Sequence, residues 1–230
     1  MADITLRRLD KGSDKPRLNV IFVHGLGGHP ITTWCYEGGE DGDYFWLKGV
    51  AKGVENIAVY TLSYPSDKAA WNTGWPIATA AVAVLDKLMS SSQLRESGEA
   101  PIAFVCHSLG GLIIKKLVLT AHLDRGQHPT KGRFLDRIAA IVFLSTPHYG
   151  SIISSIASSA HWFVSKSLKD LKASDEALLD LGHTYRDRIA NKEASIRHKV
   201  YYETEGMWGA RVVTPANRRG PRGITPPTPL

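Results

Sequence analysis

A single serine between two apolar runs is the feature that most constrains the fold of this chain. Residues 101–106 (PIAFVC) form a short apolar run, Ser108 lies within the segment 107–111 (HSLGG), and a second apolar, helix-forming run begins at Leu112. This order predicts a sharp turn from a strand into a helix, which lifts the serine hydroxyl clear of the backbone. Such a turn is a nucleophile elbow.

The residues two before and two after the serine must be small, because the strained turn brings them close together. Gly110 meets this demand after Ser108. Cys106 stands before it, at the position where glycine is commonest, and cysteine is small enough to fit. We therefore predict that Cys106 is a buried, small apolar residue and not a second nucleophile.

A glycine-rich turn follows an early apolar strand. Residues 18–23 (LNVIFV) predict a buried strand that leads directly into residues 24–28 (HGLGG). Such a turn lets backbone N–H groups point at a developing oxyanion, and the residue after the nucleophile supplies the second donor. We assign this predicted oxyanion hole to the N–H groups of Leu26 and Leu109. The alternative for the turn is an ordinary flexible loop, but a serine elbow farther along the chain favours the functional interpretation.

These motifs resemble the α/β-hydrolase superfamily, and within it a branch of serine esterases. The branch includes the GPI inositol-deacylase-like and "serine active site containing" proteins. Residues 23–30 (VHGLGGHP) are similar to its oxyanion segment, and residues 107–111 to its elbow. Further similarity lies in 33–34 (TW), 45–47 (FWL), 60–64 (YTLSY) and 144–151 (LSTPHYGS). The resemblance implies a serine hydrolase that cleaves a carboxylic ester, of a lipid or another acyl group, through an acyl-Ser108 intermediate.

The order of apolar segments predicts an α/β fold, a mostly parallel twisted sheet with helices on both faces. Helices are expected from Pro76, with an apolar stripe that includes Ile77 and Val84, and over residues 109–121. Residues 123–135 are predicted to be a loop, because glycine and proline interrupt them. We expect strands at 19–23, 57–62, 101–106, 138–144, 198–203 and 211–214.

Residues 151–195 are longer than a simple connection between two strands needs. Their apolar stripe, which includes Leu181, Tyr185 and Ile189, predicts one or two crossover helices on the sheet. The alternative is a cap over Ser108 that shapes an acyl or lipid pocket. Tryptophans could line such a pocket or belong to the core, namely Trp34, Trp46, Trp71, Trp75 and Trp162.

In this fold the catalytic acid and histidine follow the serine along the chain. Glu203 is the candidate acid and Glu205 the reserve, although a strand-end surface glutamate is an equal alternative. The resembling branch carries an Asp-His pair farther on, but residues 206–230 contain no His, Asp or Glu. We therefore expect the usual base to be absent, and His148 is the candidate substitute base. We expect His183 and His198 at the surface or at helix ends.

Composition supports one hydrolase domain, residues 1–210, followed by a Pro/Arg-rich tail, residues 211–230. The tail holds four arginines, five prolines and no acid, so without it the formal net charge falls from +6 to +2. A nucleic-acid-binding face is therefore not expected. The tail is either disordered or a truncated or altered C-terminus.

Two cysteines give no disulfide framework, and no apolar stretch resembles a signal peptide or a membrane span. We expect an intracellular, cytoplasmic protein without a metal or cofactor, whose partner is a small-molecule ester or lipid, and association with an organelle stays open. Peripheral membrane contact and a protein partner stay open. The competing hypothesis is a catalytically inactive hydrolase module used for interaction.

Overall fold

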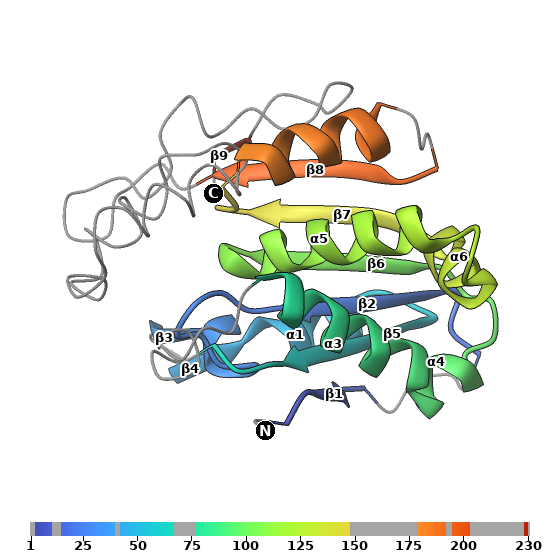
Figure 1. Ribbon diagram of the computed structural model, residues 1–230. Helices are drawn as coiled ribbons and strands as arrows, with labels where there is room; N and C mark the ends of the chain where they lie inside the picture. Colours follow the sequence, from blue (N-terminus) through green and yellow to red (C-terminus); the bar gives the residue numbers. More distant parts are fainter. Residues whose placement is uncertain are drawn as a thin grey trace.

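A seven-stranded, mostly parallel sheet forms the centre of the molecule (Figure 1). The computed structural model describes residues 3–10, 15–39, 42–66, 77–147, 179–191, 195–202 and 228–229. The strands lie in the order β1-β5-β2-β6-β7-β8-β9, and every neighbouring pair is parallel except β1 and β5. Their bounds are β1 Thr5–Arg8, β2 Leu18–Val23, β5 Ile57–Ser63, β6 Ile102–His107, β7 Ile138–Leu144, β8 Arg197–Tyr202 and β9 Thr228–Pro229.

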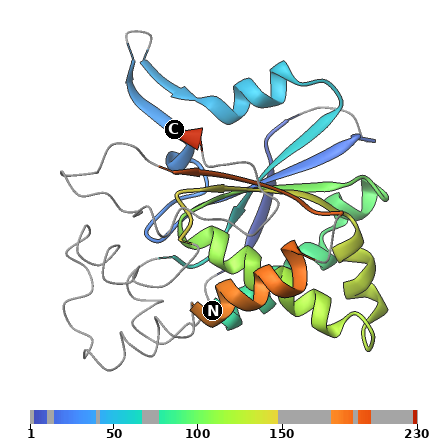
Figure 2. The same ribbon diagram turned by 90° about the horizontal axis from the view of Figure 1, so that it is seen from above.

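Helices cover both faces of this sheet (Figure 2). One face carries α3 (Ile77–Ser90), α5 (Leu109–Asp124), α6 (Pro129–Asp136) and the helical residues 179–190, which end in the π-helical turn η2 (Arg186–Ala190). The opposite face carries α1 (Trp46–Gly53), which lies across the sheet from those helices in Figure 2. This arrangement confirms the predicted α/β class with helices on both faces.

Each face buries its own apolar core. The larger core joins α3, α5 and residues 179–190 to the sheet, and includes Phe104, Phe143 and Tyr185. The smaller core packs Phe22 of β2 against Trp34 and Trp46, with ring centroids 5.2 and 5.3 Å away in edge-to-face arrangements. Trp34 is therefore a core residue, and the partly buried Trp46 packs against that core. Trp71, Trp75 and Trp162 lie outside the described residues.

Five of the six expected strands are confirmed, and their ends differ from the expected bounds by no more than one residue. The sixth, 211–214, lies outside the described residues. The predicted loop over 123–135 is wrong, because α5 continues to Asp124 and α6 begins at Pro129. Proline suits a first helical position, since its missing N–H has no intrahelical partner there. Burial of Phe134 and Leu135 then stabilises α6 despite Gly132.

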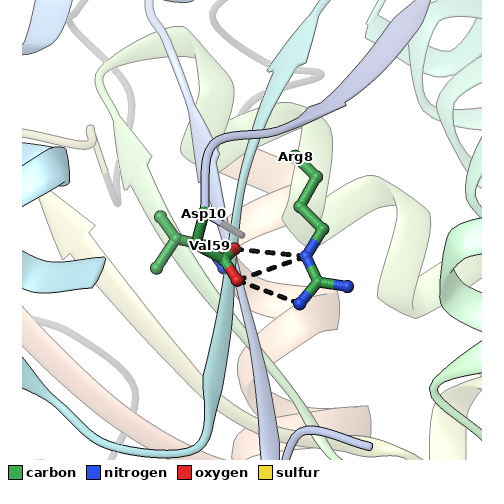
Figure 3. A network of polar contacts seen from close by, with 3 residues as sticks. All are labelled: Arg8, Asp10 and Val59. Carbon is green, nitrogen blue, oxygen red and sulfur yellow. Dashed lines mark hydrogen bonds and ion pairs between the residues drawn. The ribbon is translucent and has the colours of Figure 1, made fainter. Parts of the chain in front are cut away.

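Several elements carried no clear signal in the sequence. They are the antiparallel hairpin β3 (Cys35–Gly39) and β4 (Gly42–Phe45), the 3₁₀ turn η1 (Thr32–Trp34), α1, and α4 (Ser92–Glu96). The edge strand β1 was also not expected. Asp10 fixes its end, because its carboxylate accepts hydrogen bonds from the Arg8 guanidinium at 2.9 Å and from the Val59 N–H at 2.8 Å (Figure 3).

The long segment before β8 is described only at its end. Leu181, Tyr185 and Ile189 are buried in the larger core, as expected for a crossover helix packed on the sheet. Residues 151–178 lie outside the described residues, so the cap over Ser108 stays a prediction. Within the predicted tail, Thr228 and Pro229 form β9 beside Tyr201 and Tyr202 of β8. No helix in the described ranges combines the length and apolar character needed to cross a bilayer.

Candidate active site

The site lies where the order of the parallel strands reverses. From β2 the chain proceeds to β5 on one side, and the later strands β6 and β7 lie on the other. In an open α/β sheet, a crevice forms at such a switch point, outside the carboxyl ends of the strands. Residues 24–28 follow the end of β2, and Ser108 follows the end of β6. The topology therefore brings the two predicted motifs together.

Ser108 occupies a sharp turn between β6 and α5. Its backbone has φ 49° and ψ −119°, a conformation that is strained for a residue with a side chain. Two hydrogen bonds fix the turn, since Ser108 N–H donates to Leu144 O at 2.9 Å and Gly111 N–H donates to Ser108 O at 3.1 Å. The predicted strand–turn–helix geometry is thus present.

Gly110 and Cys106 take the places that the elbow geometry requires. A Cβ on Gly110 would overlap the His24 carbonyl oxygen and lie 2.7 Å from the Val23 carbonyl oxygen, so only glycine fits. Cys106 is fully buried, and burial raises the pKa of its thiol well above the usual value. It is a neutral core residue, which agrees with the prediction.

The glycine-rich loop 24–28 packs directly against the serine. A Cβ on Gly25 would lie 3.0 Å from Ser108 Cβ and 2.9 Å from His107 Nδ1. The loop turns at Gly27, whose φ of 65° favours glycine. The close approach of loop and serine thus depends on the absence of a side chain at Gly25.

The two predicted oxyanion donors lie at the edges of this contact. Leu109 is the first residue of α5, so its N–H has no intrahelical acceptor and lies at the positive end of the helix dipole. Leu26 follows Gly25 in the loop. In the part of the chain that the structure describes, the backbone bonds of the loop use Gly27 N–H and Gly28 N–H, and none uses Leu26 N–H.

His24 and the segment after β5 support the loop, a feature that the sequence did not indicate. Tyr64 O–H donates to the His24 carbonyl at 2.7 Å, and the two rings stack with centroids 4.4 Å apart. Ser66 contacts the loop through its carbonyl, which accepts from Gly27 N–H at 2.7 Å. Burial lowers the pKa of His24 to about 4, so its imidazole is neutral at pH 7.

The other predicted site residues, Glu203, Glu205 and His148, lie outside the described residues and stay predictions. The expectation of a surface position is wrong for His198, whose Nε2 lies 2.8 Å from Tyr185 Oη between β8 and the helical residues 179–190. Within the described ranges, no group of three His, Cys, Asp or Glu side chains is placed to hold a metal ion.

Comparison with known proteins extends these findings. The family model described as "Putative serine esterase (DUF676)" matches residues 13–201. Protein SERAC1 of Danio rerio is 26% identical over 198 residues, covering 78% of this chain and 30% of that protein. Protein SERAC1 of Homo sapiens is 24% identical over 200 residues, covering 80% and 30%. This chain therefore corresponds to about a third of the length of these relatives.

Solved structures share the fold at low sequence identity. Phospholipase PlaB from Legionella pneumophila, in complex with thio-NAD, has a TM-score of 0.55 and 16% identity, covering 87% of this chain and 40% of that one. Lipase BlEst2 from Bacillus licheniformis has a TM-score of 0.51 and 16% identity, covering 99% and 88%. Together with the elbow at Ser108, these matches show that the chain has the α/β-hydrolase fold and belongs to the family DUF676.

Proposed function

We propose that this chain hydrolyses a carboxylic ester through an acyl-Ser108 intermediate. The observation that carries the proposal is the strained Ser108 turn in direct contact with the loop 24–28. A positive φ at a serine is costly and is kept at sites where the side chain must be presented in one direction. The family match to serine esterases supports the same reaction.

In the proposed reaction, Ser108 Oγ attacks the ester carbonyl carbon and gives its proton to a base. The carbonyl oxygen becomes an oxyanion, which the N–H groups of Leu26 and Leu109 stabilise together with the dipole of α5. Collapse of this intermediate breaks the bond to the alcohol, which leaves with the proton. Water then attacks the acyl-serine in the same way, releasing the carboxylic acid and restoring the hydroxyl.

The base and its partner are proposed from the sequence. Glu203, with Glu205 as reserve, follows the end of β8 and is the proposed acid. His148 follows β7, the strand beside the elbow strand, and is the proposed substitute base. Substituting His148 by Gln and Glu203 by Gln tests these roles separately, because each should lower turnover without changing substrate affinity.

A second candidate function is a hydrolase module without activity that binds a partner. The sequence feature that favours it is that residues 206–230, which follow the proposed acid, contain no histidine, aspartate or glutamate. A serine without a base is a poor nucleophile, so such a module would keep the fold and lose the chemistry. The two candidates differ in one measurable property, the reactivity of the Ser108 hydroxyl.

A fluorophosphonate probe measures that reactivity, because phosphonylation requires an activated hydroxyl. Ser145 offers a matched control, since it also follows a sheet strand with a positive φ of 47°, but its side chain is buried. The hydrolase proposal expects labelling of the unsubstituted protein and of Ser145→Ala, with none in Ser108→Ala. A folded protein that resists the probe favours the inactive module instead.

A further inference from the structure

We propose that Tyr64 is a positioning residue that holds the loop 24–28 so that the Leu26 N–H is presented to the Ser108 site. This inference rests on the proposed function, because it assigns a role in forming the oxyanion hole. It also deepens that function, since it names the residues outside the loop on which the hole depends. Three separate sets of contacts carry it.

The first set joins Tyr64 to His24. Tyr64 directly follows β5, and β5 pairs in parallel with β2, so Leu62 lies opposite Val23. This register places the ring of Tyr64 against that of His24, with an interplanar angle of 4° and a centroid distance of 4.4 Å. The hydroxyl donates to the His24 carbonyl at 2.7 Å. Tyr64 is only 3% exposed, so water does not replace this bond readily.

The second set comes from Ser66, two residues farther on. Its carbonyl accepts from Gly27 N–H at 2.7 Å, and its Oγ donates to Gly28 O at 3.0 Å. Tyr64 and Ser66 therefore bind opposite ends of the loop, the first at its entry and the second at its turn. A loop fixed at both ends loses little conformational freedom when it must stabilise charge.

The third set orients the peptide between Gly25 and Leu26. The Gly25 carbonyl accepts from Gly28 N–H at 3.1 Å, and His24 Nδ1 lies 3.0 Å from it. Because a carbonyl can only accept, the Nδ1 of His24 carries the proton in this contact. The described peptide bonds are trans, so the Leu26 N–H points away from the Gly25 oxygen. Fixing that oxygen therefore fixes the direction of the proposed donor.

The alternative is that Tyr64 merely packs in the core. Tyr60 provides the comparison, because it lies on β5, the strand that Tyr64 follows, and is also buried. Within the described residues its hydroxyl has no hydrogen-bond partner. Replacing Tyr60 or Tyr64 by Phe thus removes one buried oxygen from β5 or its end, but only Tyr64→Phe releases the loop.

The experiment compares Tyr64→Phe with Tyr60→Phe by two measurements. The first is p-nitrophenyl acetate hydrolysis, for which Tyr64→Phe should lower kcat about tenfold with KM within about twofold, since one buried hydrogen bond is lost. The second is native-state hydrogen exchange of the Gly27 and Gly28 amides, which should accelerate about tenfold in Tyr64→Phe and not in Tyr60→Phe. Ser66→Ala should act in the same direction, with a smaller effect.

The two measurements separate this inference from the proposed function. If the unsubstituted protein shows no turnover that depends on Ser108, the hydrolase proposal fails, and the exchange rates alone decide whether Tyr64 holds the loop. Unchanged exchange of Gly27 and Gly28 in Tyr64→Phe overturns the inference in either case. In an active protein, faster exchange without a fall in kcat also overturns it, because the loop would then not position a catalytic donor.

Discussion

Gly110 of α5 lies directly against the carbonyl oxygen of His24 in the loop after β2. A Cβ at Gly110 would overlap that oxygen and lie 3.0 Å from Val23 Cγ1. The same carbonyl accepts the hydrogen bond of Tyr64 O–H. One backbone oxygen thus links the start of the elbow helix, the glycine-rich loop and the end of β5. Changes at any of these three elements are therefore expected to reach the Ser108 site.

The substitution Gly110→Ala tests this contact. The added methyl group must displace backbone atoms of β2 and the loop, which are less able to move than side chains. We expect the free energy of unfolding to fall by about 1–3 kcal/mol or more, as for other overpacked sites. Urea denaturation measures this change. Gly53→Ala is the control, because a Cβ there meets no atom within 4 Å and should leave stability equal or slightly higher.

A second prediction concerns the buried end of β1. Asp10 has a side chain only 5% exposed and accepts from both Arg8 and the Val59 N–H. Asp10→Ala leaves that N–H and the Arg8 guanidinium without their acceptor, and should lower the free energy of unfolding by about 1–3 kcal/mol.

The exposed ion pair of Arg125 and Asp136 provides the contrast for this prediction. The Asp136 side chain is 62% exposed, so Asp136→Ala should change stability by less than about 1 kcal/mol in the same urea titration. Equal losses for the two variants would mean that the contacts of Asp10 do not stabilise β1.

The central strands and the elbow could be predicted from the sequence because their signals are local. β2, β5 and β6 are nearly continuous apolar runs, as expected for strands buried on both faces. Ser108 and Gly110 follow such a run at fixed spacing. The failure over residues 123–135 has a tertiary cause. Glycine and proline within this segment predict a loop, but burial of Phe134 and Leu135 against the core stabilises α6.

The support of the site could not be predicted in the same way. Tyr64 and His24 are 40 residues apart, and their contact follows from the parallel register of β5 and β2, which the sequence does not specify. The hairpin β3–β4 has many glycines and acids between positions 37 and 43, so its strand pattern was weak. Glu203, Glu205 and His148 stay predictions, because they lie outside the described residues.

A third prediction concerns acid stability and His198. Burial and the nearby Lys115 charge lower the pKa of His198 to about 4, and burial lowers that of His24 to about 4, from 6.5 for a free side chain. Between pH 4 and 6.5 the unfolded chain therefore binds more protons than the folded chain, and stability falls as the pH falls through this window.

The variant His198→Gln should make the free energy of unfolding less dependent on pH between 4 and 6.5, because one of these groups no longer titrates. Urea titrations at pH 4.5, 5.5 and 6.5 give the slope. His128→Gln, at an exposed position, controls for the loss of an imidazole. A slope that stays as steep in His198→Gln as in the unsubstituted protein would contradict the assignment.

The last prediction concerns Lys115, a lysine of α5 that is only 2% exposed. Its Nζ lies 5.4 Å from the centre of the Phe143 ring and 5.9 Å from that of Tyr185. Those rings favour the charged form, but burial dominates and lowers the pKa of Lys115 to about 7 from 10.5. Between pH 7 and 10.5 the unfolded chain thus binds one more proton, so this group makes stability rise with pH across that window.

Lys115→Met keeps the length of the side chain and removes its charge. We expect the variant to be more stable at pH 7 and to lose the rise, which amounts to about 1.4 kcal/mol per pH unit for one group. Urea titrations at pH 7, 8.5 and 10 measure it, with the neighbouring and more exposed Lys116→Met as control. If Lys115→Met and Lys116→Met keep the same pH dependence as the unsubstituted protein, Lys115 stays charged in the folded state and the assignment fails.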